Sequence, residues 1–182
     1  ALGEHLGVLT ALYLIVYVAW GASLVVLSLA LHERLRGETS ALARIATAFG
    51  QIWAVLVIAS GMIYNVGMQA VVALSETAAE QAATVWLAVE VVFEGLGGGV
   101  EVVGGIWVLL LSVVGLRDGL LSRPFSLFGF LVGAAGLLSV VPALSEITVS
   151  VFGLTQIVWF VWLGIIMLRR PAPVTAAAPE RA

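Results

Sequence analysis

Three glutamates stand inside one of the most apolar stretches of this chain, residues 83–116, ATVWLAVEVVFEGLGGGVEVVGGIWVLLLSVVGL. An ionisable carboxyl group is expensive to place in hydrocarbon, so a carboxyl group at membrane depth indicates a functional site by default. Glu90, Glu94 and Glu101 also share one helix face, because steps of 4 and 11 residues at about 100° per residue bring them within roughly 40° of one another. Such a cluster could bind a proton, a cation or a polar substrate.

The depth of each glutamate decides which of them is unusual. Counting back about 20 residues from Arg117 places the outer edge of the hydrocarbon near Gly97. Glu101 therefore lies inside the membrane, Glu94 at its boundary, and Glu90 in a helical extension above it. The alternative is that Glu90 and Glu94 are ordinary solvated interface residues and that Glu101 is a hydrogen-bonded packing residue.

Two amides join the glutamates in the hypothetical substrate or ion site. The spacing of Asn65 and Gln69 places both on one face near the outer end of a neighbouring antiparallel helix, at a depth comparable with that of Glu94 and Glu101. Hydrogen bonding between helices is the alternative role for both amides. The other polar side chains at membrane depth that could hydrogen-bond to Glu101 are Gln51, Ser60, Ser139, Thr155 and Gln156.

Glycines surround Glu101 and recur in the next apolar stretch. In lipid, small residues let neighbouring helices approach closely, so we interpret both groups as packing seams. A bend or break of the helix near residues 97–99 is the alternative, because broken helices at membrane depth expose backbone groups that transporters use to coordinate ions. The packing glycines are Gly95, Gly97, Gly98, Gly99, Gly104 and Gly105 in the first group and Gly129, Gly133 and Gly136 in the second.

The composition of the chain indicates an integral membrane protein. Its 182 residues are 62% hydrophobic and 10% charged, with a mean hydropathy of +1.14, which excludes a soluble domain of this size. Five apolar stretches are long enough to cross a hydrocarbon core of about 30 Å. We therefore predict an all-α bundle of five transmembrane helices with short loops and a disordered cytoplasmic tail, residues 171–182. The predicted spans are 7–31, 45–68, 84–116, 125–144 and 147–168.

The basic residues orient the predicted bundle. All eight are arginines, and they fall in the first loop, the third loop and the segment after the last span. The opposite side holds glutamates and no basic residue, so the positive-inside rule predicts a bacterial plasma-membrane protein with its N-terminus outside and its C-terminus in the cytoplasm. The chain begins with Ala1 and not with methionine, from which we expect a signal peptide or, preferably, a sixth span upstream.

Several kinds of chemistry find no support in the sequence. The absence of cysteine and lysine excludes disulfides, thiolate metal sites, c-type haem and lysine Schiff bases. His5 and His32 stand at opposite ends of the first span and cannot ligate one haem together. Glutamate pairs near His5 could bind a divalent cation, but no fixed ligand loop accompanies them, so we predict no metal site and leave any cofactor unidentified. There is also no P-loop, no serine triad and no nucleic-acid-binding patch.

Four segments of the chain carry a resemblance to a known group. They read ALHERLRG, ALARIATAFGQIWAVLVIASGMIYNVG, EGLGGGVEVVGGIWVLLLSVVGLR and VFGLTQIVWFVWLGIIMLRR. Over roughly residues 25–170 the chain resembles an uncharacterised family of bacterial multi-pass membrane proteins that carry a domain of unknown function. In that family the glycine run is typically followed by an asparagine and a glutamate, whereas here the pair is Val100 and Glu101. The resemblance implies a small bundle with an additional N-terminal span, and it implies no substrate, cofactor or partner.

Two functions from different classes stay open. Glycine seams, minimal loops and the lack of a catalytic constellation favour a non-enzymatic accessory or structural subunit, with membrane lipids and either other transmembrane subunits or further copies of itself as partners. The alternative is a small transporter or an ion or proton pathway that uses Glu101 together with Glu94, Asn65 and Gln69. A membrane enzyme ranks third, because the sequence offers no acid, base or metal constellation for intramembrane catalysis.

Overall fold

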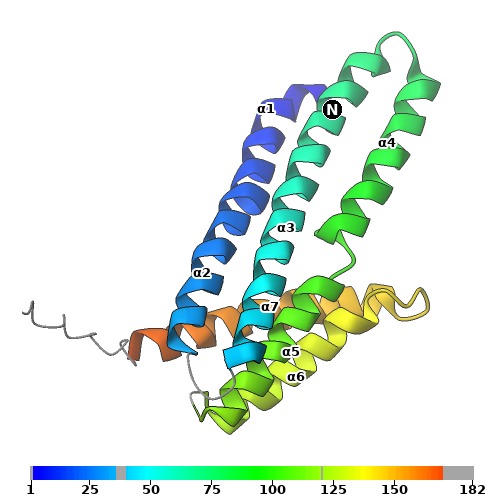
Figure 1. Ribbon diagram of the computed structural model, residues 1–182. Coiled ribbons are helices and arrows are strands. Elements are labelled where there is room, and N and C mark those ends of the chain that lie inside the picture. Colours follow the sequence, from blue (N-terminus) through cyan, green and yellow to red (C-terminus); the bar gives the residue numbers. More distant parts are fainter. Residues whose placement is uncertain (1, 36–39, 120, 170–182) are drawn as a thin grey trace, which may run out of the picture.

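This computed structural model describes residues 2–35, 40–119 and 121–169, and these consist of helices joined by short turns, with no strand among them (Figure 1). Two short elements, η1 and η2, are π-helical turns, which are rare and occur frequently at functional sites. The predicted tail lies outside the described residues, and the predicted sixth span lies upstream of Ala1. The elements in chain order are α1 (Leu2–Tyr13), η1 (Leu14–Ala19), α2 (Trp20–Arg34), α3 (Ser40–Ser75), α4 (Ala79–Phe93), η2 (Glu94–Gly98), α5 (Val102–Arg117), α6 (Arg123–Leu138) and α7 (Ser145–Arg169).

Four helical stretches are long and apolar enough to cross a membrane, which confirms the predicted all-α class but not the count of five spans. They are His5–Arg34, Ala41–Ser75, Ala79–Arg117 and Ser145–Arg169. The predicted fourth span is shorter: α6 has 16 residues, about 24 Å at 1.5 Å per residue. Residues 139–144, predicted as helix, form turns, because Pro142 has no N–H with which to continue a helix. Ser145 and Glu146, which lie between the predicted spans 125–144 and 147–168, begin α7.

The helices form two layers that cross (Figure 1). In the first layer, α1, η1 and α2 make one rod that runs antiparallel to α3, and α4 packs beside the upper half of α3. In the second layer, α5 packs on α3, and α6 packs between α5 and α7; these three helices are inclined to the first layer and cross its lower half. The chain passes from one layer to the other within the predicted span 84–116, which is therefore two helices and not one.

The core lies where the two layers meet and is built from aromatic rings. Trp107 and Trp159 are 1% and 0% exposed, and their ring centroids lie 5.6 Å apart. The ring of Trp53, from α3, lies 5.6 Å from that of Trp107. A Cβ added at Gly104 would lie 2.6 Å from the Trp53 ring, so this glycine leaves the space that the indole fills.

α5 and α6 pack backbone against backbone along predicted seam glycines. A Cβ added at Gly105 would lie 2.8 Å from the carbonyl oxygen of Gly133 and 2.9 Å from the amide nitrogen of Leu137, and one added at Gly136 would lie 2.7 Å from the Cα of Gly105. Main-chain atoms cannot move aside as a side chain can. Small residues are therefore what allow these two helices to approach so closely.

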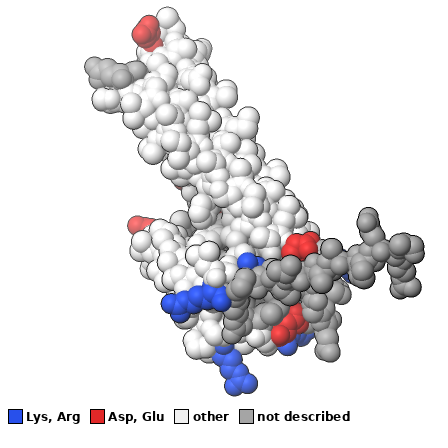
Figure 2. All heavy atoms as spheres, turned by 90° about the vertical axis from the view of Figure 1, so that its left-hand side faces the viewer, with Lys and Arg blue, Asp and Glu red and all other residues white. Residues whose placement is uncertain are grey.

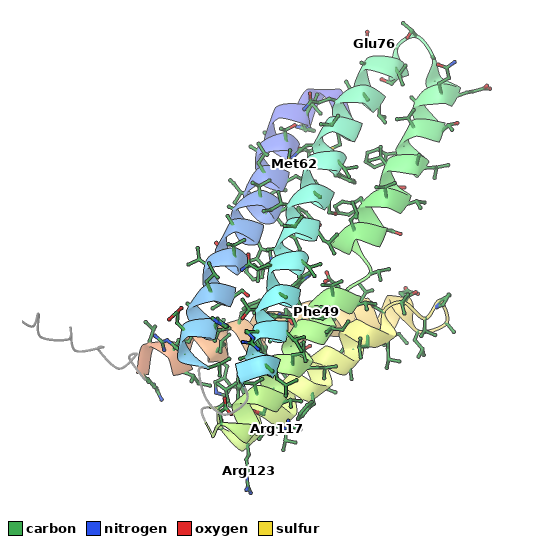
Figure 3. All side chains as sticks on the ribbon, in the orientation of Figure 1. Phe49, Met62, Glu76, Arg117 and Arg123 are labelled. Atoms are coloured by element: carbon green, nitrogen blue, oxygen red, sulfur yellow. The ribbon has the colours of Figure 1, made fainter. Side chains whose placement is uncertain are left out.

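The described arginines gather at one end of the molecule. Figure 2 shows their side chains at the lower end, and Figure 3 labels Arg117 and Arg123 there, with Glu76 at the opposite end. Arg34 donates a hydrogen bond of 2.8 Å to the main-chain oxygen of Met167 and so ties the end of α2 to α7. Segments that are far apart in sequence thus bring their basic residues to one side of the fold.

Candidate functional site: a carboxylate at a broken helix

The predicted helix 84–116 is broken within and directly after η2, at residues 97–101, and the glycine run is the cause. Gly97 has φ +124° and ψ 19°, a backbone conformation that residues with a side chain rarely adopt. The carbonyl oxygen of Glu94 accepts hydrogen bonds from the N–H groups of Gly99, at 3.3 Å, and Val100, at 3.0 Å. The break, which the sequence left as the alternative to packing, is therefore what the structure contains.

The glycines of the break do not take part in the seam between α5 and α6. A Cβ added at Gly98 or Gly99 would meet side chains of the same segment, those of Phe93 and Glu94 respectively. A Cβ added at Gly95 or Gly97 would meet nothing within 4 Å. Backbone freedom, and not close packing, is the role that the structure gives to Gly97.

Two buried serines hydrogen-bond to the main chain on either side of the break. Ser60 of α3 donates to the carbonyl oxygen of Phe93, at the end of α4, over 3.0 Å. Ser139, directly after α6, accepts a hydrogen bond of 2.8 Å from the N–H of Glu101 and donates one of 2.7 Å to the carbonyl oxygen of Gly136. The two serines are 0% and 1% exposed. Such partners are needed at membrane depth, because hydrocarbon offers none to exposed backbone groups.

Glu101 stands at the N-terminus of α5 with its side chain toward α3. The indole N–H of Trp53 donates a hydrogen bond of 3.3 Å to Oε2 of Glu101. The main-chain oxygen of Glu101 accepts the N–H of Gly105 over 2.8 Å and so closes the first turn of α5. A helix N-terminus favours negative charge, so both the indole and the position in the helix suit a carboxylate.

The depth of Glu101 follows from its contact with Trp53. Trp53 lies about 13 Å above Arg44 along the axis of α3, at 1.5 Å per residue. A hydrocarbon core of about 30 Å that began at the arginine end would have its middle near this height. Glu101 therefore lies closer to the arginine end than a count along a straight helix from Arg117 predicts. The reason is that α5 is inclined (Figure 1) and begins at the break, so its length adds less distance from that end.

A cavity of about 510 Å³ opens beside Glu101, and we call it the Glu101 cavity. Both π-helical turns contribute to its wall, η1 from one side and η2 from the other. Glu101 is the only charged residue among those that line it, and the others are aromatic, aliphatic or small. The lining residues are Ile15, Val16, Tyr17, Ala19, Trp20, Ser23, Trp53, Val57, Gly97, Gly98 and Glu101.

A second depression, of about 390 Å³, lies where the break faces α6 and α7. Two exposed carboxylates, those of Glu94 and Glu146, line it, and so does Ser139. We call it the acidic groove. Because Ser139 also holds the N–H of Glu101, this serine links the acidic groove to the residue that lines the cavity.

The structure separates the three glutamates that the sequence grouped. Glu101 lines the cavity, Glu94 lines the acidic groove, and Glu90 is half-buried on α4 and lines neither. The expectation that all three share one helix face does not hold, because the break interrupts the helical phase between Glu94 and Glu101. Glu146, which the sequence did not single out as a site residue, takes the place beside Glu94 in the groove.

The two predicted amides also lie away from the cavity. Asn65 is 5% exposed, and neither of its amide atoms has a hydrogen-bond partner among the described residues. Gln69 is exposed. The partners of Glu101 are instead Trp53 and Ser139; the sequence offered Ser139 as one of several polar candidates, and it gave no signal that Trp53 faces the carboxylate.

The described side chains offer little to a metal ion. No group of three or more histidine, cysteine, aspartate or glutamate residues among them could hold one. His32 instead lies with its Nδ1 3.0 Å from the hydroxyl oxygen of Thr47, and His5 is exposed near the opposite end of the rod. What the arrangement can do chemically is bind one cation or hydrogen-bond donor through a single carboxylate.

Comparisons with protein families, with curated proteins and with solved structures find no match to this chain. The resemblance to the uncharacterised membrane family therefore stays a prediction. The function has to be argued from the geometry of the chain itself.

Proposed function

We propose that this protein is a small membrane transporter or ion pathway in which Glu101 binds a cation or a proton. The observation that carries the proposal is the place of the carboxylate, at the break of a helix and facing a cavity at membrane depth. Transporters commonly form their binding sites at broken helices near the bilayer midplane. A carboxyl group in hydrocarbon is costly, which makes a purely structural role for it expensive.

The acidic groove supports a cation as the transported species. The carboxylates of Glu94 and Glu146 are exposed and line the groove on the side of the break that faces α6 and α7. Carboxylates gathered in a concave surface raise the local concentration of cations. In the proposed pathway, the cation passes between the acidic groove and Glu101 along the break.

The proposed orientation follows the arginines. They face the cytoplasm of a bacterial plasma membrane, the N-terminus of this chain lies outside, and the C-terminus lies in the cytoplasm. In this topology α6 is a fifth span. Ser139, directly after α6, hydrogen-bonds to the N–H of Glu101, so α6 ends near the depth of Glu101. The irregular residues that follow α6 are tolerated because Ser139 and Ser145 line the acidic groove, where water can reach them.

Labelling of Glu101 by dicyclohexylcarbodiimide, a hydrophobic reagent that modifies carboxyl groups in membranes, tests the site. Mass spectrometry of the purified protein should find the label on Glu101 and should find less label in Glu101→Gln. At least one cation from a panel of Na⁺, K⁺, Mg²⁺, tetraethylammonium and tetraphenylphosphonium should slow the labelling of the wild-type protein. Glu90→Gln is the matched control, because its carboxylate lines neither the cavity nor the acidic groove, and it should leave this protection intact.

Proton movement needs a separate measurement, because pH itself changes the reactivity of a carboxyl group. Liposomes that contain the protein and a pH-sensitive dye are given a membrane potential, and the rate of proton entry is followed. If protons are the substrate, Glu101→Gln should lower the rate about tenfold or more relative to wild type and to Glu90→Gln. Failure of every cation to protect, together with proton entry that does not depend on Glu101, would refute the proposed function.

A docking role is the second candidate, and the position of α4 favours it. Within the described part of the chain, α4 packs on α3 and on its own continuation η2, and on no other helix to a comparable extent. Its remaining faces carry exposed apolar side chains, among them Leu87 at 63% and Val91 at 70% exposure. A photo-cross-linking residue placed at position 91 should then capture a transmembrane partner in the source membrane; cross-links to lipid alone would argue against this role.

A further inference from the structure

We infer that the ligand of the Glu101 cavity is an amphipathic organic cation, an ammonium or phosphonium group on an apolar body, which enters from the lipid. This inference rests on the proposed function, since it names the class of cation that the same carboxylate binds. Three features of the cavity carry it: its size, the chemistry of its wall, and the side on which it opens.

The size of the cavity suits an organic ligand better than a bare ion. A volume of about 510 Å³ lies in the range of about 300–1,000 Å³ that is typical of small-molecule sites. Ca²⁺ takes about six to eight oxygen ligands and Mg²⁺ about six, at short distances. The wall of the cavity supplies one carboxylate, so a hard metal ion would keep most of its water shell in an apolar space.

The wall combines one negative charge with aromatic rings. Tyr17, Trp20 and Trp53 all line the cavity together with Glu101. Aromatic faces attract organic cations through their π electrons, and aromatic cages are a common way to bind quaternary ammonium groups. An anionic ligand would meet the carboxylate of Glu101 and no compensating basic residue, because none lines the cavity.

The cavity opens toward the side of the bundle. Ile15, Val16 and Trp20 line it, yet they are 67%, 48% and 40% exposed. At the depth of Trp53 the surroundings of the bundle are acyl chains, so these exposed side chains mark a mouth that faces lipid. An amphipathic cation partitions into the bilayer first and would reach the carboxylate from there, between η1 and the break.

The test uses two probes of one shape and opposite charge, tetraphenylphosphonium and tetraphenylborate. The purified protein in phosphatidylglycerol nanodiscs is titrated with each probe while tryptophan fluorescence is recorded, and empty nanodiscs provide the correction for partitioning into lipid. Tetraphenylphosphonium should bind saturably and slow the labelling of Glu101 by carbodiimide, and tetraphenylborate should do neither. Glu101→Gln should weaken binding of tetraphenylphosphonium about thirtyfold or more, because the ligand charge loses its partner in a desolvated site.

Two further variants guard against a loss of binding that merely reflects misfolding. Glu90→Gln, whose carboxylate lines neither the cavity nor the acidic groove, should bind tetraphenylphosphonium within about twofold of wild type. Ala19→Phe changes an exposed position at the wall of the cavity and should weaken binding about tenfold by occupying the space, while Glu101 and its partners stay in place. Equal binding by wild type and Ala19→Phe would overturn the assignment of the ligand to this cavity.

The outcomes separate the inference from the proposed function. Two results would overturn the ligand class and leave the proposed function standing. One is that only inorganic cations slow the labelling of Glu101. The other is proton flux that depends on Glu101 while tetraphenylphosphonium does not bind. No protection and no flux would overturn both. The same cationic chemistry is present in choline headgroups, so weaker binding of tetraphenylphosphonium in phosphatidylcholine nanodiscs would identify a lipid headgroup as the occupant, and unchanged binding would identify a free solute.

Discussion

Glu101 differs from the other acidic residues of the chain in the groups that its surroundings offer. Trp53 donates a hydrogen bond to its carboxylate, and Ser139 accepts the hydrogen bond of its backbone N–H. Glu94, only seven positions earlier in the sequence, is exposed and contributes its carbonyl oxygen to the break. One carboxylate is therefore held toward a cavity, and the other is free to meet solvent.

Gly97 is the residue whose replacement tests the break. We expect Gly97→Ala to lower the free energy of unfolding by about 1–3 kcal/mol, because a side chain is strained at its positive φ. The space around the position is open, so the cost comes from the backbone alone. Unfolding in mixed micelles with increasing dodecyl sulfate, followed by tryptophan fluorescence, measures it.

Gly95→Ala is the matched control for that substitution. A Cβ at Gly95 also meets nothing within 4 Å, but Gly95 is not among the glycines with a positive φ. This substitution should leave stability unchanged or raise it by up to about 1 kcal/mol, because alanine has the higher helix propensity. Equal effects at the two positions would show that the chain does not break at Gly97.

Ser139 is the second residue whose replacement is informative. Ser139→Ala leaves the N–H of Glu101 without its buried partner, and we expect a loss of about 1–3 kcal/mol in the same unfolding titration. The control is Ser150→Ala, since Ser150 is exposed and only bonds back to Glu146 in its own helix. It should change stability by less than about 0.5 kcal/mol. A Ser139→Ala variant as stable as Ser150→Ala would remove Ser139 from the support of the break.

At the scale of elements, the pairing of α5 and α6 depends on close approach of their backbones. Gly105→Ala would place a methyl group against main-chain atoms of α6, so we expect it to cost about 1–3 kcal/mol through overpacking. Gly153→Ala on α7 is the control, because a Cβ there meets nothing within 4 Å. Thermal unfolding in detergent compares the two variants. A melting temperature of Gly105→Ala equal to that of Gly153→Ala would mean that α5 and α6 are not packed as described.

The helical elements could be predicted from sequence because lipid imposes the pattern. Backbone groups in hydrocarbon must be paired within a helix, so long apolar stretches such as residues 45–68 reveal their structure directly. The break was harder to predict, because a glycine run is compatible with both a packing seam and a turn of the backbone. These two structures differ only in the backbone angles of the glycines. The structure uses both, at Gly105 for packing and at Gly97 for conformation.

The neighbours of Glu101 could not be predicted, because sequence fixes phase along one helix but not the register between helices. Asn65 and Gln69 are one helical turn apart, yet Asn65 is buried and Gln69 is exposed. A step of four residues rotates the side-chain direction by about 40° around the helix. This rotation is enough to place Gln69 outside the narrow face of α3 that neighbouring helices cover. Trp53 reaches Glu101 only because α5 is inclined and begins at the break (Figure 1).

At the scale of the whole molecule, the two ends of the bundle carry opposite charge. The described arginines lie at one end and Glu76 lies at the other (Figures 2 and 3). The acidic groove and the Glu101 cavity meet at the break, above the arginine end. If the arginines face the cytoplasm, as proposed, the groove and Glu76 face the outside.

Single cysteines test this orientation, because the chain has no cysteine of its own. Glu76→Cys, Ala143→Cys and Arg123→Cys all change exposed positions, and each is treated in intact cells with a maleimide that does not cross membranes. We expect labelling at positions 76 and 143, and labelling at position 123 only after the membrane is permeabilised, because arginine-rich segments stay in the cytoplasm. Labelling of position 123 in intact cells would reverse the orientation. Position 143 labelled only after permeabilisation, or in neither condition, would mean that α5 and α6 do not cross the bilayer, and the acidic groove would then not open to the outside.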